Sequence, residues 1–233
     1  MGQAFDIQLI GRYFWILLEY LPVSLTILFF SLVLGGIVGA LLAVPRLYKW
    51  PVADGLCAAY ISFFRATPII IQLILIFYVL PELLKAAGLQ LPEVPPAVYV
   101  VLTFGLNNGA SLAEIFRASV NSVDRGQSEA AASVGLSGWD SFMRIILPQA
   151  LRVAMPHLSN VVISSLKDTS LAFSVGVMDM MGRGEAIGRV YFHMLEVYIS
   201  LAIIYYAVCL LLQYFFGRAE RRLQRHERAL TGT

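Results

Sequence analysis

The chain has 233 residues, of which 58% are hydrophobic and only 14% are charged, and its mean hydropathy is +0.74. A soluble domain carries about 25% charged residues, so this composition excludes a soluble globular protein and indicates an integral membrane protein. The net charge of +2 is small and gives no indication of a nucleic-acid partner. We expect one all-α transmembrane domain over residues 1–233, because a chain of this length holds about five helical spans.

Five stretches are long and apolar enough to cross a bilayer as helices of about 20 residues. The first contains Gly35 and Gly39, whose spacing suits a close contact between helices. It is longer than the apolar part of a signal peptide and lacks a clear cleavage site, so we interpret it as a retained span. The second contains Thr67 and Pro68, and a proline inside a span either frees a backbone carbonyl toward a cavity or simply kinks the helix. The predicted spans are residues 21–44, 56–80, 97–116, 153–177 and 195–216.

Basic residues in the connecting segments indicate the orientation in the membrane. If the C-terminal segment is cytoplasmic, five spans place the N-terminus outside, where the only basic residues are Arg12, Lys85, Arg183 and Arg189. The cytoplasmic segments then hold Arg46, Lys49, Arg117, Arg125, Arg144, Arg152, Arg218, Arg221, Arg222, Arg225 and Arg228. This excess predicts an external N-terminus, a cytoplasmic C-terminus and a cytoplasmic segment 124–148. The basic C-terminal segment is either a topology anchor or a site for anionic lipid.

The segment 129–148, with the sequence EAAASVGLSGWDSFMRIILP, looks like two short soluble helices joined at a glycine. We expect Ser128 to cap the first helix. Gly135 can adopt the left-handed conformation that ends a helix. Ser137 and Asp140 have the spacing of a capping box, which predicts the start of the second helix.

The same segment resembles the EAA loop of the permeases of binding-protein-dependent ABC importers. It has the letters EAA, three residues, a glycine, nine residues, an isoleucine, one residue and then LP. The resemblance implies that this loop docks into a cleft on a cytoplasmic ATPase subunit. The alternative is a helical hairpin that merely connects two spans. The implied ATPase-coupling residues are Glu129, Ala130, Ala131, Gly135, Ile145, Leu147 and Pro148.

Flanking stretches resemble the polar amino acid branch of this family. They read FFRATPIIIQL, AEIFRASVNSVDRGQSEAA and LKDTSLAFSVGV. Ala66 stands where a glycine is common and Ser111 where an aromatic residue is common, and neither departure disturbs the class. The resemblance implies a bacterial cytoplasmic membrane protein whose partners are membrane lipid, a second identical or similar permease subunit, two cytoplasmic ATPase subunits and an extracytoplasmic amino-acid-binding protein. The stretch SVGVMDMMGRGEAIGR looks most like cystine-type permeases, while other polar amino acids stay open.

Polar residues form a stripe in each of two predicted spans. Asn107, Ser111 and Glu114 recur on one helical face, as do Asn160, Ser164 and Lys167. Charged groups at membrane depth are costly, so they need partners or water. Facing stripes with Glu114 near Lys167 would line a passage for a small zwitterion. The alternative is a closed network that pairs Glu114 with Lys167, and Arg117 with Asp168.

The resemblance favours the passage, because in the family the region matching Lys167, Asp168 and Thr169 borders the amino acid route, as does the polar part of the third span. The candidate substrate-path residues are Thr67, Asn107, Ser111, Glu114, Ser164, Lys167, Asp168 and Thr169.

The sequence contains no catalytic motif. It lacks the G-x-x-x-x-G-K-[ST] pattern of ATP hydrolysis, and His157 and His193 lack metal-ligand spacing. Cys57 and Cys209 are interpreted as packing residues. We therefore expect no cofactor or metal in this chain, and the resemblance implies that ATP and Mg bind the partner ATPase subunits. The competing hypothesis is a self-contained secondary amino acid transporter or a channel.

Overall fold

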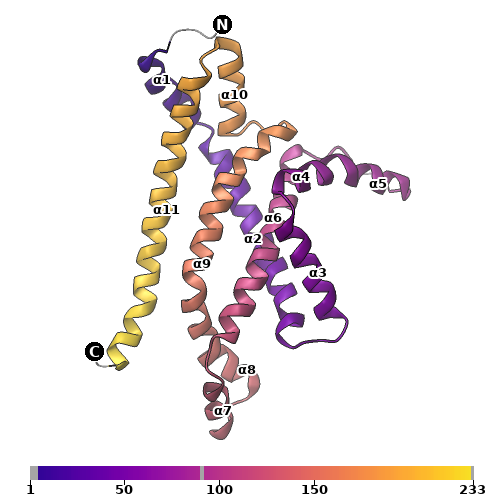
Figure 1. Ribbon diagram of the computed structural model, residues 1–233, viewed down its shortest axis with the longest axis vertical. Helices are drawn as coiled ribbons and strands as arrows, with labels where there is room; N and C mark the ends of the chain where they lie inside the picture. Colours follow the sequence, from indigo (N-terminus) through magenta and orange to yellow (C-terminus); the bar gives the residue numbers. More distant parts are fainter. Residues whose placement is uncertain (1–4, 90–91, 232–233) are drawn as a thin grey trace.

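A computed structural model describes residues 5–89 and 92–231, and every regular element in these ranges is a helix (Figure 1). The all-α class is therefore confirmed. The α-helices are α1 (Ile7–Leu18), α2 (Leu21–Leu47), α3 (Ala53–Ala66), α4 (Ile69–Ile74), α5 (Leu80–Ala86), α6 (Pro96–Asn121), α7 (Arg125–Ser133), α8 (Gly138–Ser141), α9 (Leu147–Asp168), α10 (Met180–Tyr191) and α11 (Met194–Thr231). Two π-helical turns, η1 (Leu75–Val79) and η2 (Phe142–Ile146), and one 3-10 helix, η3 (Thr169–Val175), complete the set.

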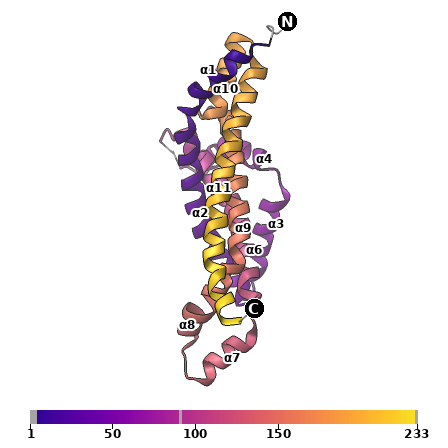
Figure 2. The ribbon, with the colours of Figure 1, turned by 90° about the vertical axis from the view of Figure 1, so that its left-hand side faces the viewer.

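Helix α6 runs through the middle of the bundle, where it packs against α2, α3 and α9, and α11 packs along α9 (Figure 1). Viewed from the side, α7 and α8 lie at one end of the molecule and α1 and α10 at the other (Figure 2). The side chains of Arg225 and Arg228, which entered the orientation argument, lie outside the described residues.

Fewer helices qualify as membrane spans than the five expected. By length and composition the described residues contain three, Leu21–Leu47, Ile69–Ala86 and Met194–Leu223, or four if the pair Gly138–Val175 and Met180–Tyr191, bent by 52°, counts as one. Helix α6 covers the predicted third span, but Asn107 and Asn108 lower its hydropathy. This central helix packs against other helices rather than exposing all its sides, so it can carry polar side chains.

The predicted second span, residues 56–80, is not one continuous helix. α3 ends at Ala66, and α4 begins at Ile69 and leads away from α3 (Figure 1). A residue before proline is pushed toward extended backbone, and Thr67 is extended with φ −105° and ψ 141°. The proline therefore breaks the helix here instead of only kinking it.

The predicted fourth span, residues 153–177, also divides. α9 ends at Asp168, and the chain continues as η3 up to Gly176, which has φ +85°. Asp179 then caps α10, its Oδ1 accepting a hydrogen bond of 2.9 Å from the Gly182 N–H. The left-handed glycine ends the predicted span close to its expected C-terminus, and the new cap starts α10 as a separate helix, bent by 52° from Gly138–Val175.

Glycines allow α2 and α6 to cross closely. A Cβ on Gly35 would lie 2.7 Å from the Cβ of Asn108, and one on Gly39 would lie 2.8 Å from the Cβ of Leu112. On the facing helix, a Cβ on Gly109 would lie 2.5 Å from Cγ1 of Val38. Both helices thus contribute small residues, and the close contact predicted for Gly35 and Gly39 is confirmed.

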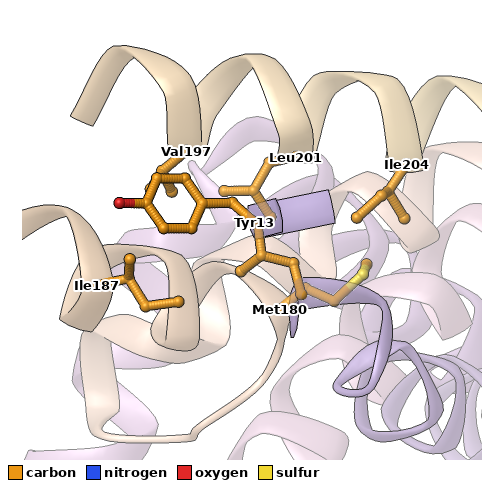
Figure 3. Packing of buried hydrophobic residues seen from close by; sticks show 7 residues of the cluster. Tyr13, Met180, Ile187, Val197, Leu201 and Ile204 are labelled. Carbon is orange, nitrogen blue, oxygen red and sulfur yellow. The ribbon is translucent and has the colours of Figure 1, made fainter. Parts of the chain in front are cut away.

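The sequence analysis did not predict α1. This helix places Tyr13 and Leu17 against α10 and α11, in an apolar cluster (Figure 3). Polar contacts support it, because the backbone N–H of Asp6 donates to Oε1 of Glu196 at 2.9 Å, and Ser200 donates to the carbonyl of Ile10 at 3.0 Å. The other members of the cluster are Met180, Ile187, Val197, Leu201 and Ile204.

Candidate functional site: a coupling loop and a polar groove

The loop 124–148, which the sequence predicts to be cytoplasmic, begins with helix α7. The N-cap of this helix is Asp124 rather than Ser128. The Gly126 N–H donates to Oδ1 of Asp124 at 2.6 Å, so α7 starts at Arg125. The expected cap at Ser128 was therefore wrong, because Asp124, four residues earlier, is also a residue type that caps helices and fills that role.

Gly135 ends α7 as predicted. Its φ is +79°, and the N–H groups of Gly135 and Leu136 donate to the carbonyls of Ala132 and Ala131 at 3.0 and 3.1 Å. This is the Schellman arrangement, which requires a left-handed residue after the helix. A side chain at Gly135 would meet no atom within 4 Å, so the backbone conformation alone explains the glycine within this chain.

The second helix of the loop starts at the predicted capping box. The Asp140 N–H donates to Oγ of Ser137 at 3.1 Å, and that hydroxyl donates to Oδ2 of Asp140 at 2.6 Å. Helix α8 then passes into the π-helical turn η2, which ends just before Leu147 and Pro148. Pro148 has no N–H to donate, and the Leu147 N–H bonds instead to the carbonyl of Phe142, five residues back.

The candidate coupling residues divide by exposure. Glu129, Ala130, Gly135 and Pro148 are exposed, Ile145 and Leu147 are half-buried, and Ala131 is buried. Of these, only Ala131, which is 2% exposed, is withdrawn from the surface of the loop.

Two exposed apolar residues of the loop were missed. Val134 is 76% exposed and Trp139 is 70% exposed. An exposed tryptophan on a small helix is typical of a contact residue in protein interfaces. A tryptophan and a valine in an otherwise polar loop are visible in the sequence, so they could have been singled out.

The break between α3 and α4 is closed by polar side chains. Because Pro68 has no N–H, it cannot bond to the carbonyl of Phe64, four residues back. The side-chain amides of Gln72 and Asn107 donate to that carbonyl at 2.8 and 3.1 Å, and Asn107 also donates to Oε1 of Gln72 at 3.0 Å. Gln72 further donates to the carbonyl and the hydroxyl oxygen of Thr67 at 3.0 and 2.8 Å.

This network changes the interpretation of two candidate path residues. Thr67 and Asn107 are engaged in capping the helix break, and Gln72, which is 2% exposed, is the hub that the sequence analysis missed. A glutamine four residues after a proline in an apolar stretch could have identified it, since a buried amide needs partners.

Below the break, a polar groove of about 440 Å³ lies between α3, α6 and α9. Arg65 comes from α3, Ser111 and Glu114 from α6, and His157 from α9. Within the described ranges, no hydrogen bond or ion pair to Arg65 is present. The groove thus brings a cation without a partner close to a carboxylate, in a lining that also includes Ile115, Ala118, Ser119, Ser122 and Val153.

Neither expected pairing, Glu114 with Lys167 or Arg117 with Asp168, is present among the described residues. The Glu114 carboxylate forms an ion pair with Arg117, three residues later on the same helix, through both Nε and Nη2. Lys167 follows His157, the α9 residue level with Glu114, by about 15 Å along the helix at 1.5 Å per residue. The expectation that Glu114 lies near Lys167 was therefore wrong, as was the closed network that paired them. The helices α6 and α9 run antiparallel, with Ser165 bonded to Asn108, so Lys167 lies toward the end of the α6 stripe that is opposite to Glu114.

The α9 stripe is exposed in the single chain. Asn160, Ser164 and Lys167 lie on the same side of α9 as His157 and continue its line away from the groove. The opposite side is packed, and Ser165 donates to Oδ1 of Asn108 on α6 at 2.8 Å. Asp168 is half-buried, and the buried Thr169 bonds to the carbonyl of Leu166 at 2.7 Å. Of the candidate path residues, only Ser111 and Glu114 are brought together in one groove.

Among the residues that the structure describes, no group of three or more histidine, cysteine, aspartate or glutamate side chains could hold a metal ion.

Comparison with known proteins agrees with these features. The family model described as binding-protein-dependent transport system inner membrane component matches residues 31–225. The L-cystine transport system permease protein TcyL of Bacillus subtilis (strain 168) is 51% identical over 227 residues, covering 97% of this chain and 95% of that protein. The glutamine transport system permease protein GlnP of Escherichia coli (strain K12) is 33% identical over 209 residues, covering 90% and 93%.

Solved structures show the same fold. The crystal structure of an amino acid ABC transporter with histidines has a TM-score of 0.82 at 28% identity and covers 94% of this chain and 100% of that chain. An inward-facing structure of the MetNI methionine ABC transporter has a TM-score of 0.68 at 22% identity, which supports the fold alone. The resemblance drawn from the EAA segment is confirmed, and the chain belongs to the family of inner membrane components of binding-protein-dependent transport systems.

Proposed function

We propose that this chain is the membrane-spanning permease subunit of an ABC importer that moves L-cystine, a polar amino acid, into the cell by alternating access. The observation that carries the proposal is the combination of a polar groove in the bundle with an exposed helical loop at one end of it. The identity of 51% to the L-cystine permease TcyL supports cystine over other polar amino acids.

The groove offers complementary charges for a zwitterion. The Arg65 guanidinium suits a substrate carboxylate, because a guanidinium binds a carboxylate through two parallel hydrogen bonds. Glu114 suits the ammonium group, and its ion pair with Arg117 orients that carboxylate before substrate arrives. Ser111 and His157 add hydrogen-bonding groups beside these two residues.

Energy for transport comes from partners, because the chain has no P-loop motif of its own. Two cytoplasmic ATPase subunits would bind ATP and Mg and contact the loop through Glu129, Val134 and Trp139. Their closure would move the loop together with α9, which is continuous with it through η2, and shift the population between outward-open and inward-open forms. A second permease subunit and an extracytoplasmic binding protein complete the assembly.

This arrangement implies an external N-terminus and a cytoplasmic loop. A single cysteine introduced at Ser137 should resist membrane-impermeant thiol reagents in intact cells. Labelling of Ser137→Cys from outside would contradict the proposed orientation.

The test of the function is uptake by proteoliposomes that contain the permease, the ATPase subunits and the binding protein. We expect ATP-dependent accumulation of labelled L-cystine, and none when the ATPase carries a substitution that abolishes hydrolysis. Labelled glutamine serves as the competing substrate. Accumulation driven by an ion gradient without the ATPase subunits would instead support a self-contained transporter.

A further inference from the structure

A second groove lies beside the polar one, toward α2, and Ser119 of α6 lines both. The volume of the second groove is about 390 Å³, within the range of about 300–1,000 Å³ typical of ligand sites. α2 supplies one wall with Ala40, Val44 and Leu47, and the root of the coupling loop supplies another with Phe142 and Leu147. Apart from Ser119, the lining side chains are apolar.

The position of this groove suits a lipid chain. Its α2 wall is the last two turns of the most apolar candidate span, Leu21–Leu47, so it lies where the hydrocarbon region ends. Inside the hydrocarbon region a lipid chain is held by van der Waals packing against the groove wall rather than by exclusion of water, and an apolar lining offers no hydrogen-bonding partner to a polar ligand.

The segment that directly follows the α2 wall of the groove carries positive charge. The chain leaves Leu47 through Tyr48, Lys49 and Trp50, which are all exposed. Lys49 is held with φ +50°, and in the described part of the chain it has no ion-pair partner. The neighbouring Arg46 is already balanced by Asp54, with Nε and Oδ1 3.2 Å apart.

Next to the α2 wall, Lys49 is therefore a cation without an ion-pair partner among the described residues, between two aromatic residues of the kind that settle at the membrane surface. A phosphate that bears a net negative charge complements this arrangement, whereas a zwitterionic headgroup gains less from a single excess cation.

From this geometry we infer that the groove between α2, α6 and α9 binds an anionic phospholipid, with an acyl chain against Val44 and Phe142 and the headgroup phosphate at Lys49. The inference uses the proposed function only in assigning this end of the bundle to the cytoplasmic side. Since Phe142 and Leu147 belong to the root of the coupling loop, the bound lipid would lie directly against the segment that transmits the ATPase motion.

The test is native mass spectrometry of the detergent-purified complex of the permease with its ATPase subunits, titrated with phosphatidylglycerol or phosphatidylcholine. We expect phosphatidylglycerol to bind more tightly by about fivefold, the effect of one basic residue near a lipid phosphate. Lys49→Asn should remove this preference, because asparagine tolerates the left-handed conformation and has no charge. Lys85→Asn on α5 is the matched control and should change nothing.

Filling the groove gives an independent measurement. Ala40→Phe should abolish retention of either lipid, whereas Ala59→Phe, the same substitution at an exposed position on α3, should not. Equal binding of the two lipids, or an unchanged adduct with Ala40→Phe, would overturn the inference. Loss of the contact between two permease subunits in Ala40→Phe would also overturn it, because the groove would then be a subunit interface. Displacement of the lipid by inorganic phosphate alone would overturn it as well, because the site would then bind a bare anion. ATPase subunits that fail to co-purify with unmodified permease would contradict the proposed function instead.

Discussion

Helix α6 has two faces with different roles, one that packs against α2 and one that carries polar side chains. Gly105 and Gly109 face α2 and let the two backbones approach closely, while Asn107, Ser111 and Glu114 lie about half a turn away. The glycine face gains stability from the close approach of the two backbones, and Asn108 beside it accepts a hydrogen bond from Ser165 of α9. The polar face holds a helix break and a groove, and its charged pair is only half-buried. One helix can therefore pack the bundle with one face and line the candidate substrate route with the other.

The largest effect is expected from breaking the glycine face. Gly109→Leu would push a side chain into Val38, whose Cβ would lie only 2.8 Å from the new Cβ. Overpacking costs about 1–3 kcal/mol or more, and neither backbone can move away easily. We expect little folded protein by fluorescence-detected size exclusion. Gly36→Leu is the control, because a Cβ there meets nothing within 4 Å, and equal loss in both variants would contradict the close crossing.

Breaking the polar face should affect transport rather than folding. Glu114→Gln removes the charge that pairs with Arg117, and a hydrogen bond to a charged group contributes about 1.5–3 kcal/mol. Uptake efficiency in proteoliposomes should therefore fall by roughly tenfold to a hundredfold. Arg65→Gln should give a similar loss.

Assembly with the ATPase subunits is the control measurement for both variants. If Glu114→Gln prevents assembly while uptake per assembled complex is normal, the polar face is structural.

A smaller effect is expected where the polar face touches the helix break. Gln72→Leu removes the side-chain amide that donates to the carbonyls of Phe64 and Thr67. The carbonyl of Phe64 then keeps only Asn107 as a side-chain donor, and the carbonyl of Thr67 keeps none. A buried group without its partner costs about 1–3 kcal/mol, so the melting temperature should fall measurably. Asn107→Ala should act in the same direction, and the two losses should not add, because the residues share one network. Strict additivity in the double variant would exclude the shared cap.

The smallest effect concerns the loop that follows α6. Gly135→Ala places a side chain at φ +79°, which costs about 1 kcal/mol. Stimulation of ATPase activity should weaken moderately, and Gly135→Arg, which adds bulk and charge at the exposed surface, should weaken it further along with co-purification of the ATPase. Gly138→Ala, at a glycine of the same loop without positive φ, should behave as the unmodified protein. A normal ATPase response with Gly135→Arg would leave the loop as a connector.

Much of the local structure was predictable because it depends on neighbours in the chain. The left-handed Gly135 and the capping box at Ser137 follow from residues within a single turn. The close crossing at Gly35 and Gly39 was also visible, because small residues four apart always share a helix face. The Asp124 cap was missed since two residues near the start of α7 were chemically able to fill the same role.

What only the tertiary structure decided involves residues distant in sequence. Asn107 bonds to the carbonyl of Phe64, 43 positions away, and no spacing rule links those two residues. Likewise α1 depends on Glu196, 190 positions from Asp6, and is too short to be recognised as a separate element without the helices it covers. Glu114 pairs with Arg117 and not with Lys167, because the packing of α6 against α9 sets which charged side chains can meet. Composition and local pattern thus determined the class, the spans' approximate places and the loop, while the three-dimensional register of the helices decided which polar groups became caps and which line the groove.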